Sequence, residues 1–102
     1  MDSSNLNIHE IRSGLVVSIN GRFDHHLYHD FHALCDRVQH NQQITINLEN
    51  TTALDNSALE MLLLLREHTA QIVLKHPSPG IIRILTVANF DKLFNIITPT
   101  PA

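Results

Sequence analysis

The chain has 102 residues, of which 43% are hydrophobic and 17% charged, and its formal net charge is −3. This length suits one small domain with a single hydrophobic core. Lys and Arg are scattered singly, so no basic surface for nucleic acid is expected. The longest apolar run, residues 61–65, is far shorter than the roughly 20 residues of a membrane span, and the first residues lack a signal-peptide pattern. We therefore expect a cytoplasmic protein with neither a nucleic-acid partner nor a membrane span.

The first part of the chain predicts a β-hairpin followed by a helix. Two β-branched runs, residues 6–11 and 15–19, flank a Gly-containing turn at residues 12–14. Apolar side chains then recur at helical spacing and predict a helix from about His26 to about Gln39. The sheet is therefore expected to begin with the hairpin.

The second part predicts alternating strands and helices. Residues 49–56 are expected only to connect a strand to a helix. The elements expected in chain order are a strand at 43–48, a helix at about 57–69, a strand at 71–75, a helix at 81–88 and a short strand or extended segment at 92–97.

Helices between strands act as crossovers, so the strands that they connect must run parallel. We expect an α/β fold in which helices pack against a mixed β-sheet of four to five strands. Residues 1–98 are expected to form this one domain and residues 99–102 a flexible tail. The lone Cys35 lies among the apolar positions of the first helix, which places it in the core.

Ser57 stands at the predicted start of the second helix and has two interpretations. Ser57-Ala58-Leu59-Glu60 matches the S-x-x-E capping box, whose cap contributes about 1 kcal/mol and explains the serine without any chemistry. A hydroxyl at a helix start is also exposed beside backbone amides. A phosphate there would add about −1.5 to −2 charge next to Asp55 and Glu60 and would repel an acidic partner or disrupt an apolar one.

The second helix is apolar almost all round, since residues 61–65 read MLLLL. A helix packed on one sheet normally carries a single apolar stripe. Either the sheet and a neighbouring helix cover two sides of it, or Met61 and a leucine form an apolar docking patch. Both interpretations stay open.

The residues around Ser57 resemble those of STAS domains, in particular the anti-sigma factor antagonists of bacterial partner-switching systems. In that family a strand ends in Asp or Asn followed by Leu, and D-S-S/T-G-L opens a helix; here the segments are NL at 47–48 and DNSAL at 55–59. Ser57 takes the phosphorylatable position, whereas Asn56 replaces a hydroxyl residue and Ala58 replaces the glycine. Residues 16–26, VVSINGRFDHH, are similar to the family's second strand and G-x-L/F-D loop, and residues 81–96 to its closing helix and strand.

This resemblance implies a STAS-like fold and a regulatory function. The unphosphorylated antagonist would bind a GHKL-type serine kinase that doubles as an anti-sigma factor, phosphorylation of Ser57 would break that complex, and a PP2C-type phosphatase would restore it. Asp24 would lie beside the phosphorylation site. The docking face would comprise Asp24, Asp55, Asn56, Ala58, Met61 and Leu62. The chain would then be a substrate and a binding module, with no enzymatic activity and no cofactor.

Several alternatives remain. Small STAS proteins also serve as accessory subunits that bind the ATPase of an ABC-type lipid transporter, and there the serine need not be phosphorylated. The domain could instead belong to a larger sensory assembly of STAS domains, and a weak homodimer stays open. A hydrolase built from Ser57, His25 and Asp24 has no support in the residue spacing.

Eight histidines are present, and four of them fall at the start of the first predicted helix: His25, His26, His29 and His32. At about 100° per residue, His25, His29 and Asp36 share one stripe that faces solvent. An i, i+4 histidine pair with a carboxylate could bind a divalent metal, but structural zinc needs four converging ligands. A solvated polar face without metal is therefore favoured, with a response to mild acid as a further alternative.

Overall fold

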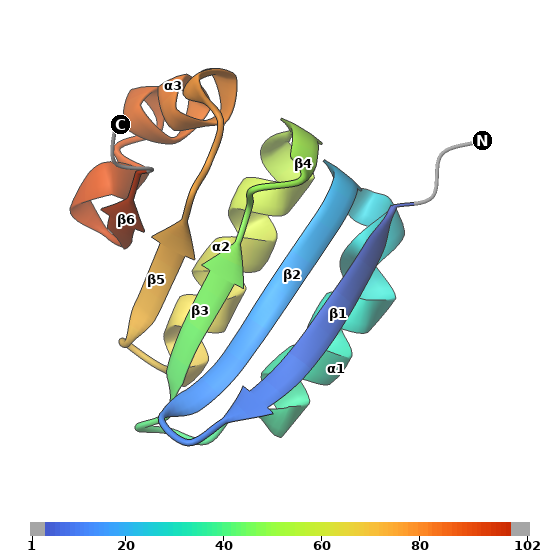
Figure 1. Cartoon of the computed structure of the whole chain (residues 1–102), viewed down its shortest axis with the longest axis vertical. Helices are drawn as coiled ribbons and strands as arrows, with labels where there is room; N and C mark the ends of the chain where they lie inside the picture. Colours follow the sequence, from blue (N-terminus) through green and yellow to red (C-terminus); the bar gives the residue numbers. More distant parts are fainter. Residues whose placement is uncertain (1–3, 99–102) are drawn as a thin grey trace.

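The computed structural model describes residues 4–98 and arranges them as a six-stranded mixed sheet with helices packed against it (Figure 1). The strands are β1 (Asn5–Ile11), β2 (Gly14–Phe23), β3 (Gln43–Asn47), β4 (Thr51–Leu54), β5 (Ile72–Lys75) and β6 (Asn95–Ile97). The α-helices are α1 (Tyr28–Arg37), α2 (Asn56–His68) and α3 (Pro79–Val87), and two short 3₁₀ helices are η1 (His25–Leu27) and η2 (Phe90–Lys92). The predicted α/β fold is confirmed.

The sheet combines one antiparallel hairpin with a parallel core. β1 and β2 form the predicted hairpin, and the strand order is β1-β2-β3-β5-β6, with every pair after the first parallel. Each parallel step contains a helical crossover, as parallel pairing requires. α1 and α2 lie behind the sheet in Figure 1 and cover the same face, whereas α3 lies beyond the end of β5.

β4 is the strand that sequence analysis misses. Residues 49–56 are expected only as a connection, but Thr51–Leu54 pair in parallel with β2. Of the long strand β2, only the first half pairs with β3. The second half is therefore available to β4. The Thr51 hydroxyl donates to the Ile19 carbonyl oxygen at 2.8 Å and anchors β4 there. The sheet therefore has six strands instead of four to five.

The core lies between the sheet and the helices α1 and α2. The side chains that fill this layer and are at most 1% exposed include Leu15, Val17, Ile19, Ile44, Ile46, Phe31, Leu34, Met61, Leu62 and Leu65. Cys35 is 3% exposed, which confirms its predicted place in the core. Burial, assisted by the charge of Asp36, raises the pKa of the Cys35 thiol from 9.0 to about 11.

The predicted helix from about His26 to about Gln39 is found as η1 followed by α1, and the predicted last helix and last short strand are α3 and β6. The domain limits stay a prediction, because the tail at 99–102 lies outside the described residues. Between residues 4 and 98, none of the helices has both the length and the apolar character needed to cross a membrane.

Candidate functional site

The candidate site lies at the edge of the sheet where β2 and β4 end side by side. Phe23 pairs with Leu54 in the parallel register, so the next residue of each strand, Asp24 and Asp55, emerges at the same edge. Both aspartates line one hollow of about 220 Å³. The hollow is lined by Arg22, Phe23, Asp24, Ala53, Leu54 and Asp55. Two residues that the sequence selects from distant segments are thus brought together.

An extra residue in β4 changes the register between β2 and β4 just before both strands end. The register between β2 and β4 shifts between Gly21 and Arg22. Gly21 has φ +83°, a conformation that favours glycine, and its N–H donates to the Asn50 carbonyl oxygen at 3.0 Å. Bulges of this kind re-aim side chains at the ends of strands. The extra residue of β4 brings Leu54 opposite Phe23, so Asp55 emerges beside Asp24 at the edge.

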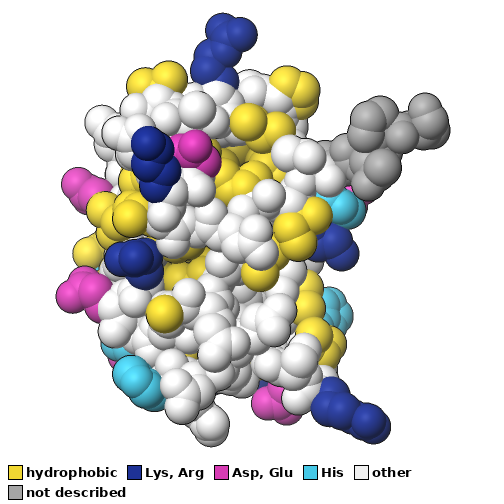
Figure 2. All heavy atoms as spheres, turned by 90° about the vertical axis from the view of Figure 1, so that its left-hand side faces the viewer, with side chains coloured by type: hydrophobic (Ala, Val, Ile, Leu, Met, Phe, Trp, Pro, Cys, Tyr) yellow, Lys and Arg dark blue, Asp and Glu magenta, His cyan; other side chains and the backbone are white. Residues whose placement is uncertain are grey.

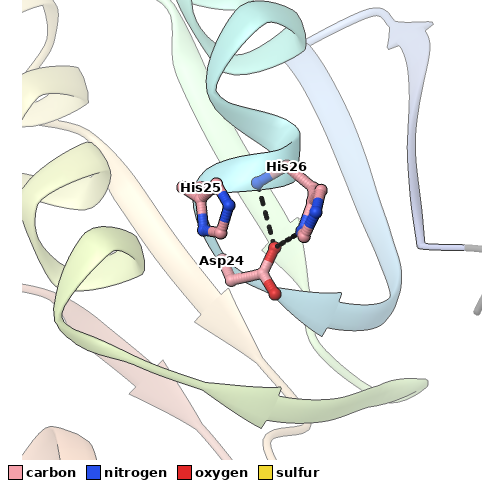
Figure 3. A group of neighbouring side chains, drawn as sticks. All are labelled: Asp24, His25 and His26. Atoms are coloured by element: carbon pink, nitrogen blue, oxygen red, sulfur yellow. Dashed lines mark hydrogen bonds and ion pairs between the residues drawn. The ribbon is translucent and has the colours of Figure 1, made fainter.

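Asp24 is fixed by the residues on both sides of it (Figure 3). Its Oδ1 accepts a hydrogen bond from the backbone N–H of His26 at 3.0 Å and caps η1, and Nδ1 of the His26 ring lies 3.0 Å from the same oxygen. Oδ2 lies 3.8 Å from Nε of Arg22. The backbone hydrogen bond is the main cause that lowers the pKa of the Asp24 carboxyl; burial opposes it, while the His26 ring and Arg22 add to it. The side chain is therefore a carboxylate at neutral pH.

Asp55 caps α2, which corrects the predicted capping box. The Asp55 carboxylate accepts the Ala58 N–H at 3.2 Å, and α2 begins at Asn56. Ser57 is therefore the second helical residue rather than the cap. Asp is as good an N-cap as Ser, and Asp55 has the extended backbone that the cap position requires, with φ −119° and ψ −173°. The serine is not needed to start the helix.

The Ser57 side chain is half-buried, and within residues 4–98 its hydroxyl makes no hydrogen bond to another protein group. Among the same residues, no buried side-chain oxygen lacks a hydrogen-bond partner. The Ser57 hydroxyl must therefore reach solvent. It lies in the first turn of α2, where backbone amides are not all used by the helix itself. This arrangement leaves the hydroxyl available for modification.

The other predicted docking residues divide into two groups. Asp55 and Asn56 are exposed, whereas Ala58, Met61 and Leu62 are at most 1% exposed. The predicted docking patch with Met61 is therefore wrong, because the sheet and α1 cover that side of α2.

A shallow hollow of about 270 Å³ does lie between α2 and the start of α1. Its most exposed apolar side chains, Tyr28 at 52% and Leu63 at 41%, are missed by sequence analysis, since residues 61–65 give no periodicity that separates inside from outside.

The histidines face solvent as predicted, but the predicted metal ligands do not converge. His25, His26, His29 and His32 are all exposed. The prediction that His25, His29 and Asp36 share one stripe requires one continuous α-helix. In the structure, His25 belongs to η1, and α1 begins only at Tyr28. In the part of the chain that the structure describes, the three residues whose ligand atoms lie within 4.8 Å of one another are Asp24, His25 and His26.

A second exposed region lies on the side of the molecule that carries α3 and β6. Figure 2 shows hydrophobic side chains gathered there among Lys and Arg side chains. The exposed apolar residues of α3, η2 and β6 and the segments between them are Ile84 (37%), Val87 (78%), Leu93 (38%) and Ile97 (44%). None of the site residues predicted from the sequence falls in this region. The carboxylates of Asp24 and Asp55 and the hydroxyl of Ser57 lie elsewhere.

Comparison with known proteins places this geometry in a family. A family model described as "Mlab, STAS domain" matches residues 7–98. A STAS-domain-containing protein of Pseudomonas aeruginosa (strain UCBPP-PA14) is 44% identical over 87 residues, which cover 80% of this chain and 86% of that protein. An anti-sigma factor antagonist from Mycobacterium paratuberculosis has a similar structure (TM-score 0.78, 20% identity, 97% of this chain and 88% of the other). So does the anti-sigma factor antagonist SpoIIAA in its unphosphorylated form (TM-score 0.66, 18% identity, 95% and 90%). The chain therefore belongs to the STAS domain family.

Proposed function

We propose that this STAS domain is a binding module controlled by phosphorylation, with Ser57 as the phosphoacceptor. The unmodified protein binds a partner protein at the β2–β4 edge, and phosphorylation of Ser57 releases that partner. The domain acts as a kinase substrate and not as an enzyme. The observation that carries this proposal is a solvent-reachable Ser57 hydroxyl with no hydrogen bond to the described part of the protein, two residues after Asp55.

A phosphate on Ser57 would act more on binding than on folding. The helix is capped by Asp55, so modification of the serine removes no cap. Amides in the first turn of α2 favour a nearby anion. The added charge of about −1.5 to −2 would lie two residues after Asp55, whose carboxylate lines the same hollow as that of Asp24. It would repel an acidic partner or disrupt an apolar contact.

The proposed class of partner is supported by analogy with similar solved structures. Two solved relatives are described as anti-sigma factor antagonists, one of them in its unphosphorylated form. By this analogy, we propose that the partner is a GHKL-type serine kinase that also acts as an anti-sigma factor. A PP2C-type phosphatase would remove the phosphate. Because such a cycle consumes ATP, we propose that the protein acts in the cytoplasm.

The first test is phosphosite mapping of the protein isolated from its own host with phosphatases inhibited. We expect phosphate on Ser57 and its absence from a Ser57→Ala chain expressed at the same level. An unmodified Ser57 across several growth and stress conditions contradicts the proposal.

The second test captures the partner with three chains: wild type, Ser57→Ala and Ser57→Glu. We expect the first two to retain a GHKL-type kinase and the glutamate variant to lose it. Equal capture of an ABC transporter ATPase by all three chains would instead support the alternative in which the domain is a constitutive accessory subunit.

A further inference from the structure

We propose that Asp24, His25 and His26 form a binding site for a divalent transition metal, a role outside the proposed phosphorylation switch. The three side chains follow β2 directly and lie together at the start of η1 (Figure 3). One oxygen of Asp24 and one ring nitrogen from each histidine all lie within 4.8 Å of one another. A single ion between them could contact all three with only small side-chain rotations.

The spacing of the Asp24 and His26 atoms fits a shared metal. Nδ1 of His26 lies 3.0 Å from Oδ1 of Asp24. Two ligand atoms that are each about 2.1 Å from a metal lie about 3.0 Å apart when they subtend a right angle, and about 3.4 Å apart in a tetrahedral site. A metal bound to both atoms therefore requires little movement. It would replace the interaction between the His26 ring and the carboxylate.

The carboxylate is held in place independently of the histidine rings. Its Oδ1 accepts the His26 backbone N–H at 3.0 Å, and that hydrogen bond can persist when a metal binds because a carboxylate oxygen has two lone pairs. A hydrogen bond of this kind is what orients ligating carboxylates in metal sites. Arg22 lies 3.8 Å from the other oxygen, so that ion pair uses Oδ2 rather than Oδ1.

Both imidazoles are available as ligands. His25 and His26 are exposed, and their ring centroids lie 4.2 Å apart. Within residues 4–98 the His25 ring makes no hydrogen bond, so its nitrogens need not give up a protein partner. Two imidazoles and one carboxylate favour ions such as Zn²⁺, Cu²⁺ or Ni²⁺ over Mg²⁺ or Ca²⁺. Two exposed imidazoles and one partly buried carboxylate leave coordination positions for water, so binding is reversible and the ion is exchangeable.

The test is calorimetric titration of the tag-free, chelator-treated full chain with zinc chloride in a non-coordinating buffer. We expect one Zn²⁺ per chain. His25→Ala and His26→Ala should each weaken binding by about tenfold or more, and Asp24→Asn should act in the same direction. His29→Ala is the matched control, because His29 is an exposed histidine of the adjoining helix that is not part of the cluster. Its affinity should equal that of the wild type.

Circular dichroism and the thermal midpoint establish that each variant is folded. Asp24→Asn keeps a side-chain oxygen that can still cap η1, and the alanine variants remove only exposed rings. As a second readout, the visible spectrum of bound Co²⁺ should change in the wild type and in His29→Ala but not in a His25→Ala/His26→Ala double variant.

Three results would overturn the site: no saturable Zn²⁺ binding, equal loss of affinity in His29→Ala, or wild-type affinity in the double variant. The titration contains no partner and no kinase. Its failure would therefore leave the proposal for Ser57 untouched, and failure of the Ser57 proposal would leave the metal site untouched.

Discussion

The first turn of α2 and the body of the same helix serve different tasks. At the start of the helix, the N-cap Asp55 and the first helical residue Asn56 are exposed, and the Ser57 hydroxyl reaches solvent. In the body, Met61 and Leu62 are at most 1% exposed and pack in the core. The difference teaches that a helix which is apolar almost all round can still offer a functional surface at its start, where caps and unpaired amides meet solvent. Under the proposed function, substitutions in these two parts of the helix should change stability and regulation separately.

Truncation in the body of α2 should give the largest effect. Met61→Ala is expected to lower the free energy of unfolding by about 2–5 kcal/mol, because it leaves a cavity in the core. Leu63→Ala, on the exposed side of the same helix, should cost about 1 kcal/mol or less. Urea denaturation of both variants measures the contrast. Equal small losses would mean that Met61 is not part of the core and would reopen its role in docking.

The free energy of unfolding, measured as the pH is raised, should report the burial of the Cys35 thiol. Its pKa is raised from 9.0 to about 11, so the fold favours the neutral thiol. The stabilisation that comes from this pKa shift is fully present below about pH 9 and is lost as the pH rises toward 11. The free energy of unfolding should fall by at most about 2–3 kcal/mol over this interval. Wild type should therefore lose more stability over this interval than Cys35→Ala, which lacks the group. Parallel curves for the two chains would contradict the burial of the thiol.

Loss of the α2 cap should have a smaller effect than loss of the core, and it should depend on which residue is changed. Asp55→Ala is expected to cost about 1 kcal/mol, within a usual range of about 0.5–2, because its carboxylate accepts the Ala58 N–H. Ser57→Ala should cost less than about 0.5 kcal/mol, since its hydroxyl caps nothing in the described structure. Urea denaturation of both variants measures the two losses of stability. A larger loss for Ser57→Ala would restore the capping box.

The sequence predicts most of the fold because its patterns are local. The hairpin, the three α-helices and the parallel crossovers all follow from periodicity and turn residues, and the structure confirms them. β4 escapes because it has only four residues with no alternation, and it depends on β2 and on the hydrogen bond from Thr51 to Ile19, 32 residues away. A contact between residues so far apart in the sequence leaves no local pattern from which β4 could be predicted.

Only part of the geometry of the candidate site can be predicted from the sequence. Asp24 and Asp55 line one hollow, and Ser57 stands in the first turn of α2, as the family pattern implies. The choice of cap depends on the backbone conformation of Asp55, which the spacing of Ser57 and Glu60 does not reveal. Sequence analysis selects His25, His29 and Asp36 as weak candidate ligands on the assumption of a continuous helix, whereas the 3₁₀ turn of η1 brings Asp24, His25 and His26 together.

The most direct test of the central claim compares the affinity of one partner for two forms of this chain. The partner captured by Ser57→Ala is titrated with the unmodified protein and with protein fully phosphorylated on Ser57. The phosphorylated form should bind at least about tenfold more weakly, because its added charge lies two residues after Asp55, whose carboxylate lines the same hollow as that of Asp24. Treatment with a phosphatase should restore the original affinity. Equal affinity of the two forms would contradict the claim that Ser57 is a switch.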